Sequence, residues 1–283
     1  MELLSVVIIT YNEEKNIGRC IDSVKEVADE IVVLDSFSTD DTVKIAEAKG
    51  AYVYRQRFEG YIAQKNRILE FAEHNYVLSL DADEALDDTL KASILKAKKG
   101  FAFKAYKMNR CANYCGKFIK HGTWYPEAKI RLFDKRFLSW GGLDPHDKIM
   151  LPSTVAVYPL KGDILHYICE NVKEHEKRID NFSSIAARSL HRTGKKTNWL
   201  KILASPGWFF LYDYILRGGF LNGYHGWMIT LNQTKYHFLK YAKLYRLQKT
   251  KPNIAIIKNL DIQPAANTDR LARNIRAHAG SQE

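Results

Sequence analysis

The sequence predicts an α/β fold with a mainly parallel sheet, helices on both faces and a helical region at the C-terminal end. From Leu4 to Leu80, short runs that are apolar throughout alternate with helical segments, as in parallel strands that are buried on both faces. From about Val172 the pattern becomes helical only. With 283 residues and 46% hydrophobic content, the chain is long enough for one large α/β domain plus an appended helical region.

Strands are expected where apolar runs are bounded by polar or turn residues. They span residues 4–9, 31–34, 51–54, 77–80, 101–108 and 128–133. Helices are expected where apolar residues recur three and four positions apart. Before residue 100 they span residues 16–27, 42–49, 62–73 and 87–98. Ligands bind outside the carboxyl ends of parallel strands, so the polar loops after Ile9, Leu34 and Leu80 are expected to meet at one cleft.

The third of these loops is acidic, because an apolar strand runs directly into three carboxylates at residues 81–84. Residues two apart in a strand point the same way, so Asp81 and Asp83 can project together while Ala82 turns inward. Paired carboxylates suit Mg²⁺ or Mn²⁺ that itself holds a diphosphate. An acidic turn or helix N-terminus would account for the triplet alone. The buried strand before it and the polar loops upstream favour the cation.

The helical region combines cations with aromatic residues. Helices are expected at residues 174–190, 200–216 and 224–246. From Arg188 to Lys251, twelve Lys or Arg accompany one acid, Asp213, so this segment carries the whole net charge of +11. Such a mixture is typical of a surface that lies on anionic lipid headgroups. A solvated basic face around an aromatic core accounts for the composition equally well. We expect domains at residues 1–170 and 171–249, and a weakly structured tail at 250–283.

Several classes of protein are disfavoured by composition. Four scattered cysteines are too few for a secreted disulfide framework and favour a reducing cytoplasm. Cys111 and Cys115 with His121 lack a fourth metal ligand and are expected to be structural. No basic leader precedes an apolar core at the N-terminus, and no run of 18 apolar residues occurs, so export and a spanning helix are not expected.

Three motifs carry a family resemblance: SVVIITYNE (residues 5–13), DSFSTDDT (residues 35–42) and LDAD (residues 80–83). With them the chain resembles the family 2 inverting glycosyltransferases, which have the Rossmann-like GT-A fold. A looser likeness, YILRGGFLNG (residues 214–223) followed by KYAK (residues 240–243), resembles the bacterial subgroup that builds the lipopolysaccharide core. Phe37 departs from the family pattern, which usually has a small residue there.

The resemblance implies a role for each motif residue. Thr10, Tyr11 and Glu13 would line the base and ribose of the nucleotide, and Asp35 would hydrogen-bond the uracil ring. Ala82 would also lie at the nucleotide, beside Asp81 on the ribose or diphosphate side. The metal would be held by Asp83, with His166 as a second contact. The segment Gln64-Lys65-Asn66-Arg67 lies where the family often places Lys or Arg, together with Asn, facing the diphosphate. Lys65 is the residue expected to neutralise phosphate charge.

An inverting transfer needs one general base opposite the leaving group. In the resembling subgroup, a His-Asp or His-Glu pair follows a glycine-containing loop, and here that pair is His146 and Asp147. Asp147 is therefore the expected base, with Asp144 as its competitor in the same loop. His146 and Arg131 are expected near the acceptor, and Arg131 alternatively at the diphosphate.

The resulting hypothesis is a cytoplasmic, metal-dependent hexosyltransferase on the inner face of the cytoplasmic membrane. It would move a sugar from a UDP-sugar to a hydroxyl of a lipopolysaccharide-core or other lipid-linked acceptor. The alternatives are transfer to polyprenyl phosphate and a non-catalytic protein that binds polysaccharide or nucleic acid. Nucleic acid is disfavoured, because the cations cluster with bulky aromatics and no recognised binding motif occurs.

Overall fold

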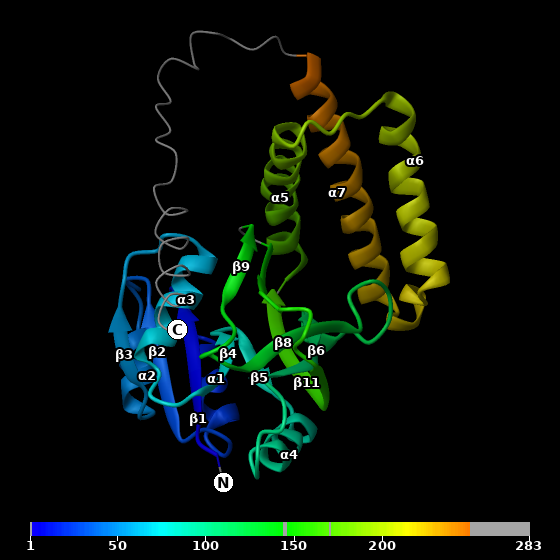
Figure 1. Cartoon of the computed structure of the whole chain (residues 1–283). Coiled ribbons are helices and arrows are strands. Elements are labelled where there is room, and N and C mark those ends of the chain that lie inside the picture. Colours follow the sequence, from blue (N-terminus) through cyan, green and yellow to red (C-terminus); the bar gives the residue numbers. More distant parts are fainter. Residues whose placement is uncertain (1, 144–145, 170, 250–283) are drawn as a thin grey trace, which may run out of the picture.

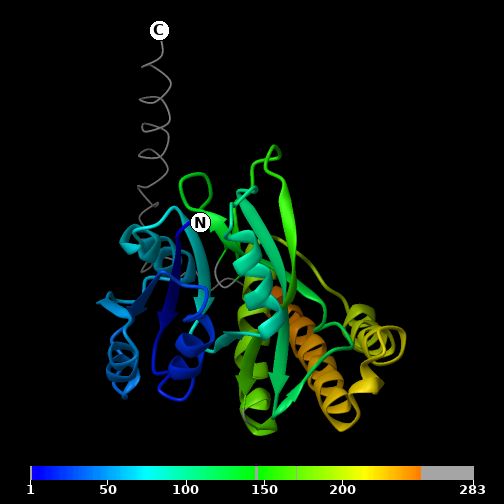
Figure 2. The ribbon, with the colours of Figure 1, turned by 90° about the horizontal axis from the view of Figure 1, so that it is seen from below.

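The structure is a computed structural model that describes residues 2–143, 146–169 and 171–249. A sheet with helices against it forms one part of the molecule, and three long helices extend from it on the side away from β1–β3 (Figures 1 and 2). The expected tail at 250–283 and the candidate base Asp144 lie outside the described residues.

Four parallel strands form the first half of the sheet, in the order β3-β2-β1-β4. They are β1 (Leu4–Thr10), β2 (Glu30–Asp35), β3 (Tyr52–Arg55) and β4 (Tyr76–Asp81). The register sets Thr10 opposite Asp35 and Ile9 opposite Asp81. The carboxyl ends of β1, β2 and β4 therefore form one edge, which we call the rim.

Helices cover both faces of this half because the residues of β1 alternate between two cores. Leu4, Val6 and Ile8 pack in one core with residues of α1 (Ile17–Val24), α2 (Thr42–Ala48) and α4 (Asp88–Ala97). Val7 and Ile9 point the other way and pack with residues of α3 (Tyr61–Phe71). The expected α/β class with two covered faces is confirmed.

The second half of the sheet is mixed. It continues from β4 through four strands in the order β8-β6-β11-β5, which are β8 (Glu127–Asp134), β6 (Ala105–Tyr114), β11 (Val157–Cys169) and β5 (Glu84–Leu86). The short β7 (Lys117–Phe118) pairs with β6. Only β6 and β11 run parallel here, whereas β8 is antiparallel to both of its neighbours. The sequence patterns indicated β6 and β8 but neither β11 nor β5.

A separate hairpin stands beside the sheet and carries the His146-Asp147 pair. It consists of β9 (Trp140–Leu143) and β10 (His146–Ile149), with Asp147 opposite Gly142. Trp140 and Ile149 join the core that also holds α3. The hairpin is thus packed against the helix that leads into β4.

The helical region contains the three expected helices. They are α5 (Val172–Arg192), α6 (Trp199–Phe210) and α7 (Tyr224–Lys249). A π-helical turn η1 (Leu211–Leu216) and a 3-10 turn η2 (Gly219–Asn222) connect the last two. Figure 1 shows α7 between α5 and α6. Among the described residues, no helix combines the length and apolar character needed to cross a membrane. The domain boundary at residue 170 stays a prediction.

Candidate active site

The rim brings the three motifs together. Ser36 N donates to the carbonyl of Thr10 at 2.9 Å, and Ala82 N donates to the carbonyl of Ile9 at 3.2 Å. Thr10, Asp35 and Ala82 are buried. Segments that lie more than 70 residues apart in the sequence therefore share one edge, because their strands are neighbours in register.

The loops after β1 and β2 are tied to each other. Asn12 N donates to Ser38 Oγ at 2.8 Å, and Thr39 N donates to Asn12 Oδ1 at the same distance. Asp35 accepts from Ser38 N at 3.0 Å, and its Oδ2 lies 4.0 Å from Arg55 Nε of β3. Phe37 adopts φ 66°, a left-handed conformation that explains why a small residue suits this place. This loop leaves the ring of Phe37 exposed.

The residues expected at the base and ribose differ in exposure. Tyr11 is 57% exposed, so its ring is free to meet a ligand. Glu13 accepts from Asn16 Nδ2 at 2.6 Å, and its backbone N donates to Thr42 Oγ1 at 2.8 Å. Both residues lie on the tied loops, and their roles at the nucleotide stay predictions.

A buried charge cluster lies beside the rim. Lys65 Nζ is 2.9 Å from Asp147 Oδ2 and 3.1 Å from Asp81 Oδ1. Arg131 Nη2 is 3.0 Å from Asp81 Oδ2 and 2.8 Å from Glu84 Oε1. Lys65 and Arg131 are almost fully buried. Asp147 of the hairpin and Asp81 of β4 are thus joined through one ammonium group.

Neighbouring charges favour the ionised forms of Asp81 and Arg131. Burial alone raises the pKa of Asp81, but the positive charges of Arg131 and then Lys65 outweigh it and hold that pKa well below its usual range. For Arg131, burial lowers the pKa, and the carboxylates of Glu84 and Asp81 more than compensate. Asp81 and Arg131 are therefore both charged at neutral pH.

The ring of Trp140 lies against this cluster, and the side-chain amide of Asn66 holds the Trp140 backbone through two hydrogen bonds that we call the clamp. Lys65 Nζ lies 4.6 Å from the centroid of the Trp140 ring, and the guanidinium of Arg131 lies 5.4 Å from it. Asn66 Nδ2 donates to the Trp140 carbonyl, and Trp140 N donates to Asn66 Oδ1, both at 2.9 Å. Helix α3 therefore supplies the lysine that meets Asp147 and the clamp that holds the hairpin.

The expected metal residues lie next to each other. His166 Nε2 is 3.3 Å from Asp83 Oδ2, and Tyr167 N donates to the Asp83 carbonyl at 2.9 Å. Among the described residues, no group of three or more His, Cys, Asp or Glu could hold a metal ion. A carboxylate and an imidazole together fit a divalent ion that takes its remaining ligands from a diphosphate and water. Asp81, the other half of the acidic pair, is engaged by Lys65 and Arg131 instead.

Polar atoms without a hydrogen-bond partner gather at the same place. Eight buried side-chain atoms of the described residues lack such a partner, and six of them belong to the rim and the charge cluster. These six are Thr10 Oγ1, Gln64 Oε1, Asp81 Oδ1, Arg131 Nε, Arg131 Nη1 and Trp140 Nε1. Asp81 Oδ1 has only its ion pair with Lys65. Buried polar groups are normally paired, so this set of donors and acceptors indicates a site for a polar ligand.

The positions of the remaining expected residues can be compared with their assignments. Arg131 was expected at the acceptor or diphosphate; its Nη2 pairs with two carboxylates, and its role toward a ligand stays a prediction. Asn66 was expected to face the diphosphate, but both polar atoms of its amide bind the Trp140 backbone. The backbone of His146 begins β10, whereas its side chain lies outside the described parts.

Two important residues of the cluster were not recognised from the sequence as such. Glu84, the third acid of its loop, is buried and binds Arg131 and the backbone N of Asp81. Trp140 stands directly before Gly141-Gly142 in the hairpin that carries the His-Asp pair, where the sequence predicted a loop, and this neighbourhood is the signal that could have identified it. The cysteine prediction is consistent with the structure, because Cys111 is buried and burial raises its pKa to about 11.

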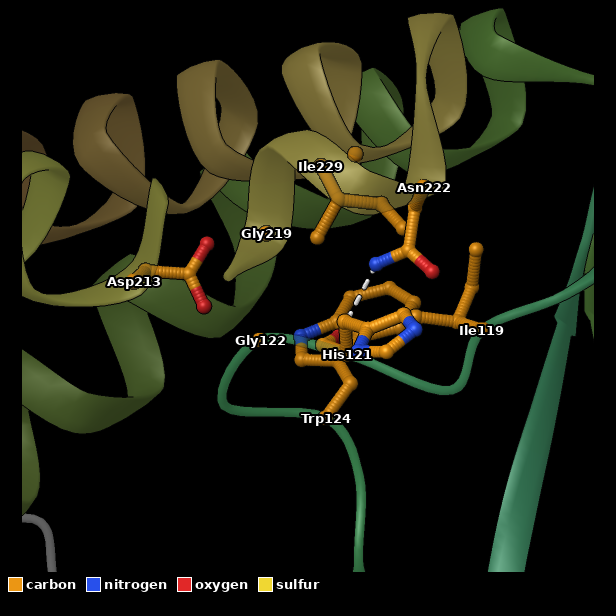
Figure 3. Close-up of a pocket in the computed structure, with 9 residues that line it drawn as sticks. Ile119, His121, Gly122, Trp124, Asp213, Gly219, Asn222 and Ile229 are labelled. Atoms are coloured by element: carbon orange, nitrogen blue, oxygen red, sulfur yellow. Dashed lines mark hydrogen bonds between the residues drawn. The ribbon is translucent and has the colours of Figure 1, made fainter. Parts of the chain in front are cut away.

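A small hollow lies away from this site, where the loop after β7 meets the helical region (Figure 3). Asp213 accepts hydrogen bonds from Thr123 N at 2.7 Å and from Thr123 Oγ1 at 2.8 Å. Asn222 Nδ2 donates to the His121 carbonyl at 3.0 Å, as Figure 3 shows. The hollow leaves no room for a water molecule and is a packing junction between the sheet and the helices.

Comparisons with known proteins give the family. The family described as "Glycosyl transferase family 2" matches residues 5–149, just over half of the chain. An uncharacterised glycosyltransferase of Rickettsia typhi is 31% identical over 274 residues, which cover 92% of each chain. The lipopolysaccharide core biosynthesis glycosyltransferase LpsC of Rhizobium meliloti is 27% identical and covers 89% of this chain and 96% of its own.

A solved structure resembles part of the chain. Glucosyl-3-phosphoglycerate synthase from Mycobacterium tuberculosis, in complex with Mn²⁺, UDP and glucosyl-3-phosphoglycerate, is 28% identical over 38% of this chain and 43% of its own, with a TM-score of 0.34. The family match and the full-length relative from Rickettsia carry the conclusion. This chain belongs to glycosyl transferase family 2.

Proposed function

We propose that this glycosyltransferase is an inverting enzyme that moves a sugar from a UDP-sugar to a hydroxyl of a lipopolysaccharide-core or other lipid-linked acceptor. The observation that carries the proposal is the meeting of Asp81, Lys65 and Asp147 at the carboxyl rim, among buried polar atoms without partners. These groups provide a cation that suits a diphosphate leaving group and a carboxylate that suits a general base.

The donor would bind over the tied loops. Carboxylates such as Asp35 and Glu13 accept hydrogen bonds from a uracil N–H or from ribose hydroxyls, and the exposed ring of Tyr11 offers a stacking surface. Lys65 would provide positive charge for the diphosphate. The buried ring of Trp140 excludes water from one side of this lysine.

A divalent ion would be held by Asp83 and His166. When bound, it would supply positive charge to the departing diphosphate. The proximity of the two side chains supports the pairing, and the published complex of the mycobacterial synthase contains Mn²⁺. Whether Mg²⁺ or Mn²⁺ is used is part of the test below.

The base would be Asp147. It is ion-paired with Lys65, and the ionised carboxylate is the form that accepts the proton of the attacking hydroxyl. The clamp between Asn66 and Trp140 fixes the hairpin that carries it. The acceptor class is supported by the name of the LpsC relative. A lipid-linked acceptor would place the enzyme on the inner face of the cytoplasmic membrane.

The proposal is tested by incubating the purified protein with UDP-sugars, Mn²⁺ or Mg²⁺ and candidate acceptors while UDP release is followed. We expect release with one sugar and a product of inverted anomeric configuration by NMR. A phosphodiester linkage in the product would instead identify polyprenyl phosphate as the acceptor. Protein that binds UDP-sugars but releases no UDP with any acceptor would contradict the proposal.

Two variants that each remove one carboxylate charge test whether Asp83 is a metal ligand. Asp83→Asn removes a proposed ligand, and Asp88→Asn removes the same charge from a carboxylate that is 97% exposed on α4. We expect Asp83→Asn to weaken Mn²⁺ binding in the presence of UDP at least about tenfold in calorimetry, and Asp88→Asn to leave it unchanged. Equal affinities in the two variants would exclude Asp83 as a ligand.

A further inference from the structure

Helix α6 and the following turn η1 have two different faces. The inner face packs on α7: the ring of Phe209 stacks on His237 with 4.5 Å between centroids, and Ser205 Oγ lies 3.4 Å from His237 Nδ1. The outer face is also apolar and is exposed to solvent. We call this face the outer stripe, and its main residues are Trp199, Leu203, Trp208, Leu211, Ile215 and Leu216.

The outer stripe is unusual for a surface helix, which normally presents polar residues to water. Its six residues expose between 42% and 64% of their surface. From Trp199 to Ile215 they follow one another at spacings of three to five positions, and Leu216 comes directly after Ile215. Figure 1 shows α6 at the edge of the molecule, with α7 between it and α5. A continuous apolar stripe in this position marks a surface that meets a partner.

The charges around the stripe indicate what this partner is. Lys195 and Lys196 precede it, Lys201 lies within it, and Arg217 follows it. Asp213 is the single acid between residues 188 and 249. It is 2% exposed and binds Thr123 and Thr230. The stripe therefore carries uncompensated positive charge, which fits an anionic surface.

The combination of residues favours a lipid surface over a second copy of this chain. Tryptophan and lysine, with apolar bodies and polar tips, are suited to the boundary between headgroups and acyl chains. In a two-fold dimer the same patch would face itself and bring these cations together. The inner face of α6 is occupied by α7, so the helix would lie along the surface with its outer side inserted.

We propose that the outer stripe and its flanking cations form a docking surface for an anionic lipid bilayer. The proposal deepens the proposed function by specifying the element that would bring the enzyme to a lipid-linked acceptor. The surface is joined firmly to the sheet: Gly122 N donates to the Arg217 carbonyl at 3.0 Å, and Arg217 Nη2 donates to the Tyr125 carbonyl at 3.3 Å. Docking would therefore also orient the catalytic sheet relative to the bilayer.

The test is co-sedimentation of the full chain with vesicles of phosphatidylcholine alone or mixed in equal parts with phosphatidylglycerol. We expect binding to the anionic vesicles that falls with added salt. The double variant Leu203→Ser/Trp208→Ser should bind them about 10–100-fold more weakly. The control Tyr52→Ser/Phe137→Ser changes two side chains of similar exposure on the sheet part and should bind like the original protein.

A charge variant tests the contribution of the flanking cations. Lys195→Glu/Lys196→Glu should weaken binding to the anionic vesicles at least about tenfold. Thermal unfolding and UDP binding, measured for every variant, show that the fold and the donor site are intact.

Two results would overturn the proposal. One is equal binding of the original protein and the Leu203→Ser/Trp208→Ser variant to anionic vesicles. The other is a dimer in light scattering that this variant converts to a monomer with vesicle binding unchanged, which would assign the stripe to a second copy. UDP release with a water-soluble acceptor is independent of docking, so its failure alone would contradict only the proposed function.

Discussion

Charged side chains are buried and paired at the rim but lie mostly at the surface in the helical region. At the rim, Lys65 and Arg131 are buried and paired with three carboxylates. From Arg188 to Lys249 in the helical region, most cations lie at the surface, the single acid Asp213 is buried, and large apolar side chains are exposed. The first arrangement concentrates charge in a small volume, whereas the second spreads charge and apolar area over a long helix.

This difference indicates which kind of binding partner suits each region. The buried polar atoms without partners at Thr10, Gln64 and Arg131 need a small polar partner, which a ligand or a water molecule can supply. An exposed apolar stripe is satisfied by a broad apolar surface and gains little from a small ligand. If the two regions have these separate roles, variants of one should leave the other's function unchanged.

The largest expected effect is that of Asp147→Asn at the proposed base. The amide cannot accept the proton of the acceptor hydroxyl, so we expect turnover to fall about 10²- to 10⁴-fold. Vesicle binding should not change, because the hairpin is not part of the outer stripe. Steady-state UDP release and vesicle co-sedimentation measure the two effects. Turnover within threefold of the original would exclude Asp147 as the base.

The second prediction concerns stability and the buried charges. Arg131→Met leaves Asp81 and Glu84 buried with reduced compensation, and we expect a loss of about 3–5 kcal/mol in the free energy of unfolding. Arg67→Met, which breaks an exposed ion pair with Glu70, should cost at most about 1 kcal/mol. Urea denaturation measures both. Similar losses in the two variants would mean that the charge cluster contributes no more than a surface pair.

The third prediction tests Asn66 as a positioning residue. Asn66→Ala removes both hydrogen bonds to the Trp140 backbone and should cost about 1–3 kcal/mol of stability. If the clamp orients Asp147, turnover should fall about tenfold while the affinity for UDP stays the same. Calorimetry with UDP and steady-state kinetics separate these quantities. A fall in both by the same factor would indicate a purely structural role.

The smallest expected effect is a pH dependence in the helical region. Burial, and then the charge of Lys240, lowers the pKa of His237 from about 6.5 to about 4. Above pH 6.5 the ring is neutral in both states. As the pH falls from 6.5 to about 4, the unfolded chain binds a proton that the folded chain does not, so stability decreases. Allowing for partial exposure, we expect a loss of about 1–2 kcal/mol.

His237→Phe provides the control for this effect. The phenyl ring can still stack on Phe209 but does not titrate, so the difference in unfolding free energy between pH 7 and pH 4 should become smaller than in the original protein. Other titrating groups contribute equally to both proteins. An identical pH difference in the two proteins would contradict the assignment to His237.

Much of the rim could be predicted from the sequence. The parallel class followed from apolar runs that alternate with helical segments, and the carboxyl ends of parallel strands meet at one edge by geometry. The motifs at Thr10, Asp35 and Asp81 were therefore correctly expected to converge. The three helices of the C-terminal region were expected within a few residues, because their apolar spacing is local information.

The contacts across the fold could not be predicted in the same way. Lys65 and Asp147 are 82 positions apart, and nothing in the local pattern of α3 indicates which loop its lysine meets. Strand β5 is only three residues long, too short for a periodicity. Asn66 illustrates the limit, since its residue type and position suggested that it faces the diphosphate, whereas its amide binds the backbone of Trp140.

The sequence by itself determined the family, the alternation of strands and helices as far as β4, and the concentration of positive charge from Arg188 onward. These features depend on short segments and on composition, which the chain carries without folding. Only the tertiary structure decided that Lys65 joins Asp81 to Asp147 and that α6 exposes one of its two apolar faces. A helix that is apolar all round has no sequence signal for its exposed side, because the packing of its neighbour alone decides which face is covered.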